Sequence, residues 1–127
     1  MIVLDTSVLI DALSGPRRSV ASLRRAIAAG ERLLVPSLVL YEWLRGPRLP
    51  EELAAQEALF PAAVAPAFGP AEAACAARLY VSLPNSRGRE IDLAIASCAL
   101  TLGARLWTLN RRDFQDLPGV ELYEASG

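Results

Sequence analysis

Short runs of apolar residues alternate along the chain with longer segments in which apolar residues recur every three or four positions. Runs that are apolar throughout predict strands buried on both faces, and a recurrence of three or four predicts helices with one buried face. The predicted strands are residues 2–4, 33–35, 63–65, 105–109 and 120–123. The predicted helices are residues 6–13, 17–29, 38–44, 50–60, 70–83 and 89–102.

This alternation of strands and helices predicts an α/β fold. Strands separated by helices pair in parallel, with helices on both faces of the sheet. The length of 127 residues fits a single domain spanning residues 1–127. Binding sites in such folds form at the carboxyl ends of the strands. Asp5 follows the first predicted strand, and Asn110 and Asp113 follow the fourth, so we expect all three at one edge of the sheet.

The charged residues narrow the chemistry that the chain can perform. With 13 basic and 14 acidic residues the net charge is −1, which excludes a generally cationic coat for nucleic acid. The chain has no His, and all 13 basic residues are Arg. Catalytic triads with His, His-ligated metals, Schiff bases on Lys and the P-loop Lys are therefore excluded.

The cysteines and the apolar runs indicate a soluble protein. Cys75 and Cys98 are isolated in apolar stretches without zinc-site spacing, and we interpret them as small buried hydrophobes. No run reaches the roughly 18 apolar residues of a membrane span, and the start of the chain lacks a secretory signal pattern. We expect no membrane association and a cytoplasmic location.

Three acidic residues lie in apolar surroundings on separate elements. They are Asp5, Glu42 and Asp92. Each also has a simpler interpretation: Asp5 as an N-cap, Glu42 as the partner of Arg45 three residues on, and Asp92 as a first-turn acid that favours the helix dipole. Together they suggest converging carboxylates, which a divalent cation would stabilise. Mg²⁺ fits, because it needs only one or two direct carboxylate ligands and can activate water beside a phosphodiester.

Four segments, in order along the chain, resemble the motifs of PIN domains, and in particular of VapC-type toxins. They are Ile2-Val3-Leu4-Asp5-Thr6-Ser7, Leu40-Tyr41-Glu42-Trp43-Leu44-Arg45-Gly46, Asp92-Leu93-Ala94-Ile95-Ala96-Ser97 and Thr108-Leu109-Asn110-Arg111-Arg112-Asp113-Phe114. The resemblance implies a PIN-like three-layer α/β/α fold with a short, mostly five-stranded parallel sheet. It also implies a metal-dependent endoribonuclease, usually a homodimer, that is encoded with a small antitoxin. In that family the antitoxin occupies the active site and binds operator DNA.

Carried over to this sequence, the resemblance assigns roles to individual residues. Asp5 and Asp92 would be ligands of Mg²⁺, with Mn²⁺ as a substitute, and Glu42 would complete the acidic cluster and orient water. The hydroxyl of Thr6 or Ser7 would bind either a carboxylate or a substrate phosphate. The predicted substrate contacts are Thr6, Ser7, Asn110, Arg45 and Arg89; ordinary surface solvation is the alternative for the arginines.

The fourth motif departs from the family pattern. Many members carry an acid where this chain has Asn110, and Asn binds a divalent cation more weakly. Asp113, three residues on, is the predicted replacement and is included among the catalytic residues. Asp11 is predicted instead to face solvent or to cap the next turn.

Two other functions stay open at this point. One is a non-catalytic PIN-like module that only binds a partner protein, which Asn110 keeps open. The other is phosphoryl transfer through an aspartyl-phosphate on Asp5, which ranks lower because the chain lacks the Lys that commonly binds the phosphate.

Overall fold

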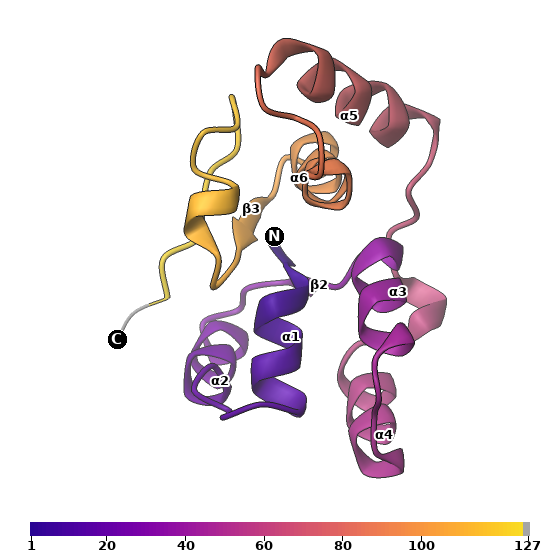
Figure 1. Ribbon diagram of the computed structural model, residues 1–127. Helices are drawn as coiled ribbons and strands as arrows, with labels where there is room; N and C mark the ends of the chain where they lie inside the picture. The colour runs from indigo at the N-terminus through magenta and orange to yellow at the C-terminus, as the bar shows by residue number, and fades with distance from the viewer. Residues whose placement is uncertain (126–127) are drawn as a thin grey trace.

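The computed structural model describes residues 1–125 and is built around a sheet of three parallel strands (Figure 1). These are β1 (Ile2–Leu4), β2 (Leu33–Leu34) and β3 (Arg105–Trp107), in the order β2-β1-β3. Val3 lies opposite Leu34 on one side and Leu106 on the other. Because β1 has a neighbour on both edges and helices on both faces, its three side chains are fully buried.

Helices cover both faces of this sheet, as the alternating pattern predicted. Figure 1 shows α1 and α2 on one side of the strands and α5 and α6 on the other, with α3 and α4 beside them. In the described residues the helices are α1 (Thr6–Leu13), α2 (Val20–Ala28), α3 (Ser37–Arg45), α4 (Pro50–Leu59), α5 (Pro70–Ser82) and α6 (Glu90–Leu102). None of them has the length and apolar content needed to cross a membrane.

Helix α6 contains a long buried run and carries one of the candidate carboxylates. Residues 93–99 are all buried, because α6 lies between the sheet and α5. Its first turn holds Asp92 near the carboxyl ends of the strands. The helix ends at Gly103, which adopts the left-handed conformation (φ 64°) that glycine tolerates best. Asp92 therefore lies on a helix that is held in place by its buried residues.

The predicted strand at residues 63–65 is wrong. This segment forms a 3₁₀ turn, η1 (Ala62–Val64), in which the Val64 amide donates to the Pro61 carbonyl at 3.1 Å. Val64 is 70% exposed, so it does not belong to a sheet. Prolines at positions 61 and 66 lack amide donors, which disfavours pairing of the short segment between them.

The predicted fifth strand, residues 120–123, contributes a single parallel bridge between Leu106 and Leu122. The sheet therefore has three strands extended by this bridge, in place of the five expected. Two other predicted boundaries shift by more than one residue: β3 ends at Trp107, and α2 begins at Val20. In the second case Arg17 adopts a positive φ of 63°, which lies outside the right-handed helical region, so the helix cannot begin at this residue.

Candidate active site

A hollow of about 440 Å³ lies at the carboxyl ends of the central strands and brings the three candidate carboxylates together. Asp5 comes from the end of β1, Glu42 from α3 and Asp92 from α6. The residues that line the hollow are Asp5, Thr6, Ser7, Ile10, Asp11, Gly15, Pro16, Glu42, Asp92 and Asn110. This convergence from three separate elements is the arrangement that the sequence predicted.

A larger groove, about 640 Å³, lies between the end of α1, α2 and α4. Its floor is mainly apolar, and Ile27 and Leu59 on its walls are each about half exposed. None of the three converging carboxylates lines it. We therefore assign the chemistry to the smaller, polar hollow.

Asp5 is the most deeply buried of the three carboxylates, at 4% exposure. The Ser7 hydroxyl donates to its Oδ2 at 2.7 Å, and the Thr108 hydroxyl donates to the same oxygen at 2.8 Å. Asp5 occupies the N-cap position of α1, yet its side chain makes no capping hydrogen bond. The simpler interpretation of Asp5 as a helix cap is therefore wrong. Neither hydroxyl engages Oδ1, which leaves that oxygen for a ligand.

Backbone amides orient both of these hydroxyls. The Leu109 amide donates to Ser7 Oγ at 3.0 Å, and the Asn110 amide donates to Thr108 Oγ1 at 2.9 Å. Each hydroxyl thus accepts one hydrogen bond from the chain after β3 and donates one to Asp5. Because these amides bond to side chains, the chain leaves the sheet after Trp107.

Glu42 is held through both of its carboxylate oxygens. Thr6 donates its hydroxyl to Oε1 at 2.7 Å, and the Arg45 guanidinium pairs with Oε2 at 3.2 Å. The predicted i,i+3 pair with Arg45 therefore exists, and the same carboxylate also faces the hollow. Ser7 and Thr6 both bind carboxylates, which is the first of the two alternatives that the resemblance offered for these hydroxyls.

Asp92 is the carboxyl group of the site whose pKa is shifted most. Partial burial and the nearby charges of Asp5, Asp113 and Glu42 raise the pKa of Asp92 to about 6, although Arg89 acts in the opposite direction. The carboxylates thus lie close enough to repel one another in the absence of a cation. A bound divalent cation would relieve this repulsion.

The donor set fits a hydrated cation better than an enclosed one. Within residues 1–125 no three His, Cys, Asp or Glu side chains are grouped closely enough to hold a metal by themselves. Asp5 and Asp92 nevertheless line the same hollow, and their charges interact. Two carboxylates are sufficient for Mg²⁺, which retains several waters and takes oxygen ligands.

The fourth motif splits between two places. Asn110 lines the carboxylate hollow, whereas Asp113 is exposed in the 3₁₀ turn η2 (Arg111–Asp113). Asp113 lines a neighbouring hollow that shares Asn110 with the first. Its charge still reaches Asp92 and contributes to the raised pKa there. The predicted catalytic function of Asp113 stays a prediction.

Thr108 and Asp11 lie at the site, although neither was predicted to belong to it. Thr108 belongs to the fourth motif, but the sequence assigned it no role. Its role in orienting Asp5 follows from a hydrogen bond between two residues that lie 103 positions apart in the sequence. Asp11 is buried and does not face solvent; its Oδ2 accepts the Ser19 amide at 2.7 Å, in agreement with the capping alternative. Asp11 also lines the carboxylate hollow.

A sequence profile of the PIN domain matches residues 2–120 of this chain. A protein named Ribonuclease VapC19, from Mycobacterium tuberculosis (strain CDC 1551 / Oshkosh), is 34% identical over 123 residues, which cover 95% of this chain and 98% of that protein. The chain belongs to the PIN-domain family. The likeness to VapC19 places it with the VapC-type members, as the four motifs predicted.

Solved structures confirm the PIN fold. DNA-bound VapBC from Salmonella typhimurium superposes with a TM-score of 0.78 at 22% identity, covering 98% of each chain. VapBC-5 from Mycobacterium tuberculosis superposes with a TM-score of 0.62 at 27% identity, covering 94% of this chain and 91% of that one. The predicted α/β class and its helix-covered parallel sheet are therefore correct.

The hydroxyl of Thr108 provides a test of how this PIN-domain chain orients Asp5. Thr108→Val removes a donor to Asp5 with little change in volume, so we expect the affinity for Mn²⁺ to fall about tenfold. Titration calorimetry would measure it. Thr101→Val is the matched control, because that hydroxyl donates to the Cys98 carbonyl on α6. Equal Mn²⁺ affinity in the two variants would show that Thr108 does not hold Asp5 for a cation.

The raised pKa of Asp92 predicts how the metal-free protein responds to pH. The unfolded chain releases the Asp92 proton near 3.8 and the folded chain at about 6. Stability is therefore lost as pH rises through this window. We expect Asp92→Asn to change the free energy of unfolding little near pH 4, but to raise it by about 1–2 kcal/mol near pH 7.5, after allowance for solvent screening. Urea unfolding at both pH values would measure this, and a variant less stable at the higher pH would contradict it.

Proposed function

We propose that this PIN-domain chain is a divalent-metal-dependent endoribonuclease that acts in the cytoplasm as the toxin of a toxin–antitoxin pair. The observation that carries the proposal is the meeting of Asp5 and Asp92 in one hollow, with two hydroxyls on a single oxygen of Asp5. The relative at 34% identity is named a ribonuclease, and the similar solved structures are VapBC complexes.

Asp5 and Asp92 would hold Mg²⁺, with Mn²⁺ able to substitute. Bound there, the cation would supply positive charge to the scissile phosphate and make a nearby water more acidic. The absence of His and Lys from the chain is compatible with this chemistry, since carboxylates and hydroxyls suffice for it.

Glu42 would accept the proton of the attacking water. Thr6 and Arg45 hold its two oxygens, so the carboxylate keeps a fixed orientation beside the hollow. Hydrolysis adds water across one P–O bond of the RNA backbone. The water oxygen bonds to phosphorus and one of its protons passes to the carboxylate, while the P–O bond to the leaving nucleotide breaks and the departing oxygen takes a proton from solvent. The three carboxylates of the hollow would repel an RNA phosphate, and the positive charge of Arg45 beside them would offset part of this repulsion.

The substrate contacts follow from the same geometry. Arg45 is half exposed and lies beside Glu42, which suits contact with an RNA phosphate. The Asn110 side chain lines the hollow and can hydrogen-bond a phosphate or a sugar. Asp113 is proposed as the fourth acid, acting from the neighbouring hollow.

A small cognate antitoxin is the proposed protein partner, and operator DNA would be bound only through that antitoxin. The toxin itself is proposed to be a homodimer. The apolar groove between α2 and α4 supports a protein partner, because an exposed apolar groove rimmed by charges is typical of surfaces that bind amphipathic segments. Arg17, Arg24, Glu51 and Glu52 form its charged rim.

RNA cleavage by the purified chain tests the proposal. We expect cleavage with Mg²⁺ or Mn²⁺, none with a chelator, and a loss of at least about a hundredfold in Asp5→Asn and Asp92→Asn, because each removes one proposed ligand. Glu57→Gln, on the exposed face of α4, is the control.

The possible outcomes separate the candidate functions. Activity that persists in either Asp variant would remove that residue from the site. A folded, antitoxin-free protein that binds Mn²⁺ but cleaves nothing in a broad RNA pool would have a narrow substrate. A folded protein that neither binds Mn²⁺ nor cleaves would favour the partner-binding module.

Asp113→Ala and Asn110→Ala together test which residue acts as the fourth acid. If Asp113 has this function, kcat should fall about tenfold or more in Asp113→Ala, because one negative charge near Asp92 is lost. A neutral Asp113→Ala, with a loss in Asn110→Ala, would transfer the function to Asn110. Steady-state cleavage at saturating Mg²⁺ would measure both.

A further inference from the structure

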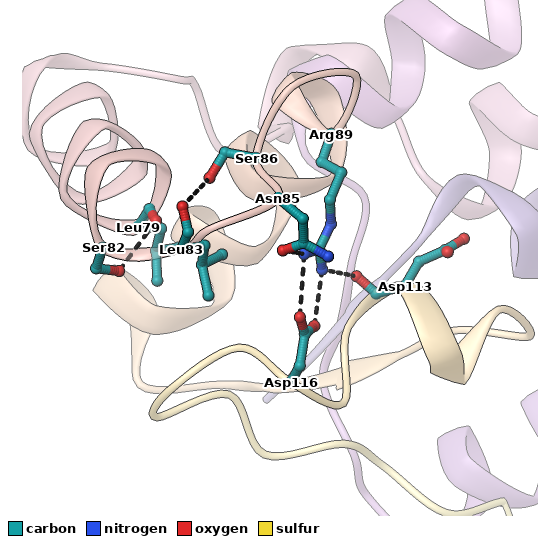
Figure 2. Close-up of polar contacts among 8 residues, drawn as sticks. All are labelled: Leu79, Ser82, Leu83, Asn85, Ser86, Arg89, Asp113 and Asp116. Atoms are coloured by element: carbon teal, nitrogen blue, oxygen red, sulfur yellow. Dashed lines mark hydrogen bonds and ion pairs between the residues drawn. The ribbon is translucent and has the colours of Figure 1, made fainter.

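Arg89 lies at the amino end of α6, three positions before Asp92, and its side chain is only 17% exposed. Its guanidinium makes a two-pronged ion pair with Asp116, at 3.0 Å to Oδ2 and 2.7 Å to Oδ1. It also donates to Asn85 Oδ1 and to the Asp113 carbonyl, each at 3.0 Å. Figure 2 shows these partners gathered around the guanidinium, with the Asp113 carboxylate pointing away from it.

These partners come from two separate stretches of chain. Asn85 lies in the loop between α5 and α6, whereas Asp113 and Asp116 lie 24 and 27 residues after Arg89. The segment that contains Asp113 and Asp116 also carries Asn110 at its start. One side chain thus connects the helix that delivers Asp92 to the loop that delivers the fourth motif.

We propose that Arg89 and Asp116 act as a positioning clamp, which sets the distance between Asp92 and the loop 110–113 so that both can serve one cation and one phosphate. The proposal rests on the proposed metal-dependent activity and gives Arg89 a function different from the predicted substrate contact. Arg89 would act through Asp92, Asn110 and Asp113 without touching the reacting atoms.

The geometry of the Arg89 pair differs from that of an ordinary surface pair. The pair between Arg111 and Glu124 has one contact at 3.2 Å, with side chains 46% and 80% exposed. Arg89 instead directs hydrogen bonds to four acceptor atoms from a half-enclosed site, and two of those atoms belong to one carboxylate. Bidentate arginine pairs of this kind restrain orientation as well as distance. The loop is also anchored by buried Phe114 and Leu117, so a variant that lacks the clamp should still fold.

The loss of Arg89's positive charge and the loss of its positioning contacts should change the affinity for a cation in opposite directions. Removal of a positive charge near a cation site strengthens cation binding by electrostatics alone. The loop that the clamp holds carries the Asn110 amide, which orients the Thr108 hydroxyl on Asp5. Removal of the clamp therefore weakens cation binding, because Asp5 and Asp92 are no longer held at the required separation. The sign of the change in affinity therefore distinguishes the two effects.

The experiment compares Arg89→Gln and Arg89→Lys with the wild-type full-length chain. We expect Arg89→Gln to bind Mn²⁺ about tenfold more weakly by titration calorimetry, despite the lost positive charge. Arg89→Lys should also bind more weakly, because a single ammonium cannot reproduce the planar fork. In both variants hydrogen exchange of amides 110–116 should accelerate in the metal-free protein, and kcat should fall more than KM changes.

Arg105→Gln is the matched control. Arg105 pairs with Glu31 at 2.6 Å at the opposite, amino end of the sheet, where Arg105 lies beside Ile2. This variant also loses an ion pair and one positive charge, but far from the hollow, so it should leave Mn²⁺ affinity and exchange at 110–116 unchanged.

Unchanged or tighter Mn²⁺ binding by Arg89→Gln, with unchanged exchange at 110–116, would overturn the clamp. If KM for RNA then rose alone, Arg89 would return to the predicted substrate contact. A wild-type chain that binds no Mn²⁺ and cleaves no RNA would instead overturn the proposed function. Even if the chain proves to be no metal-dependent ribonuclease, the clamp can be tested: hydrogen exchange at amides 110–116 that is as slow in both Arg89 variants as in the wild type would overturn it.

Discussion

The buried carboxylate of Asp5 is the constraint on which the rest of the site depends. A carboxylate taken out of water at the end of a fully buried strand is costly unless donors replace its hydration. Ser7 and Thr108 provide two such donors to one oxygen, and backbone amides of Leu109 and Asn110 orient them. The requirement to satisfy Asp5 thus joins the β1–α1 turn to the chain after β3.

This requirement also explains the shape of the sheet edge. The amides of residues 109 and 110 bond to hydroxyls, so β3 ends at Trp107 and the chain turns toward the hollow. The same turn brings Asn110 into the carboxylate hollow, while α6 and α3 deliver Asp92 and Glu42 from either side. Partial burial and repulsion from the neighbouring acids raise the pKa of Asp92, and a bound cation would relieve this repulsion.

The sequence predicted the features that local pattern and residue chemistry determine. The boundaries of α1 were correct to the residue, and the three acids in apolar surroundings met in one hollow. Features set by long-range pairing were not predictable. Thr108 became a site residue only through a partner 103 positions away, and Arg89 found partners on a loop 24 to 27 positions on. Residues 63–65 had a strand-like composition, but the flanking prolines favoured a turn.

Crystals of the chain soaked with Mn²⁺ would locate the cation and so test the proposed metal centre. We expect an anomalous-scattering peak in the hollow, about 2.1–2.2 Å from one oxygen each of Asp5 and Asp92, with water as the remaining ligands. On Asp5 the bonded oxygen should be Oδ1, since Oδ2 already accepts two hydroxyls. A well-ordered crystal with no peak there, or with a peak bound to Asp11 or Asp113 alone, would contradict the central claim that Asp5 and Asp92 form the metal centre.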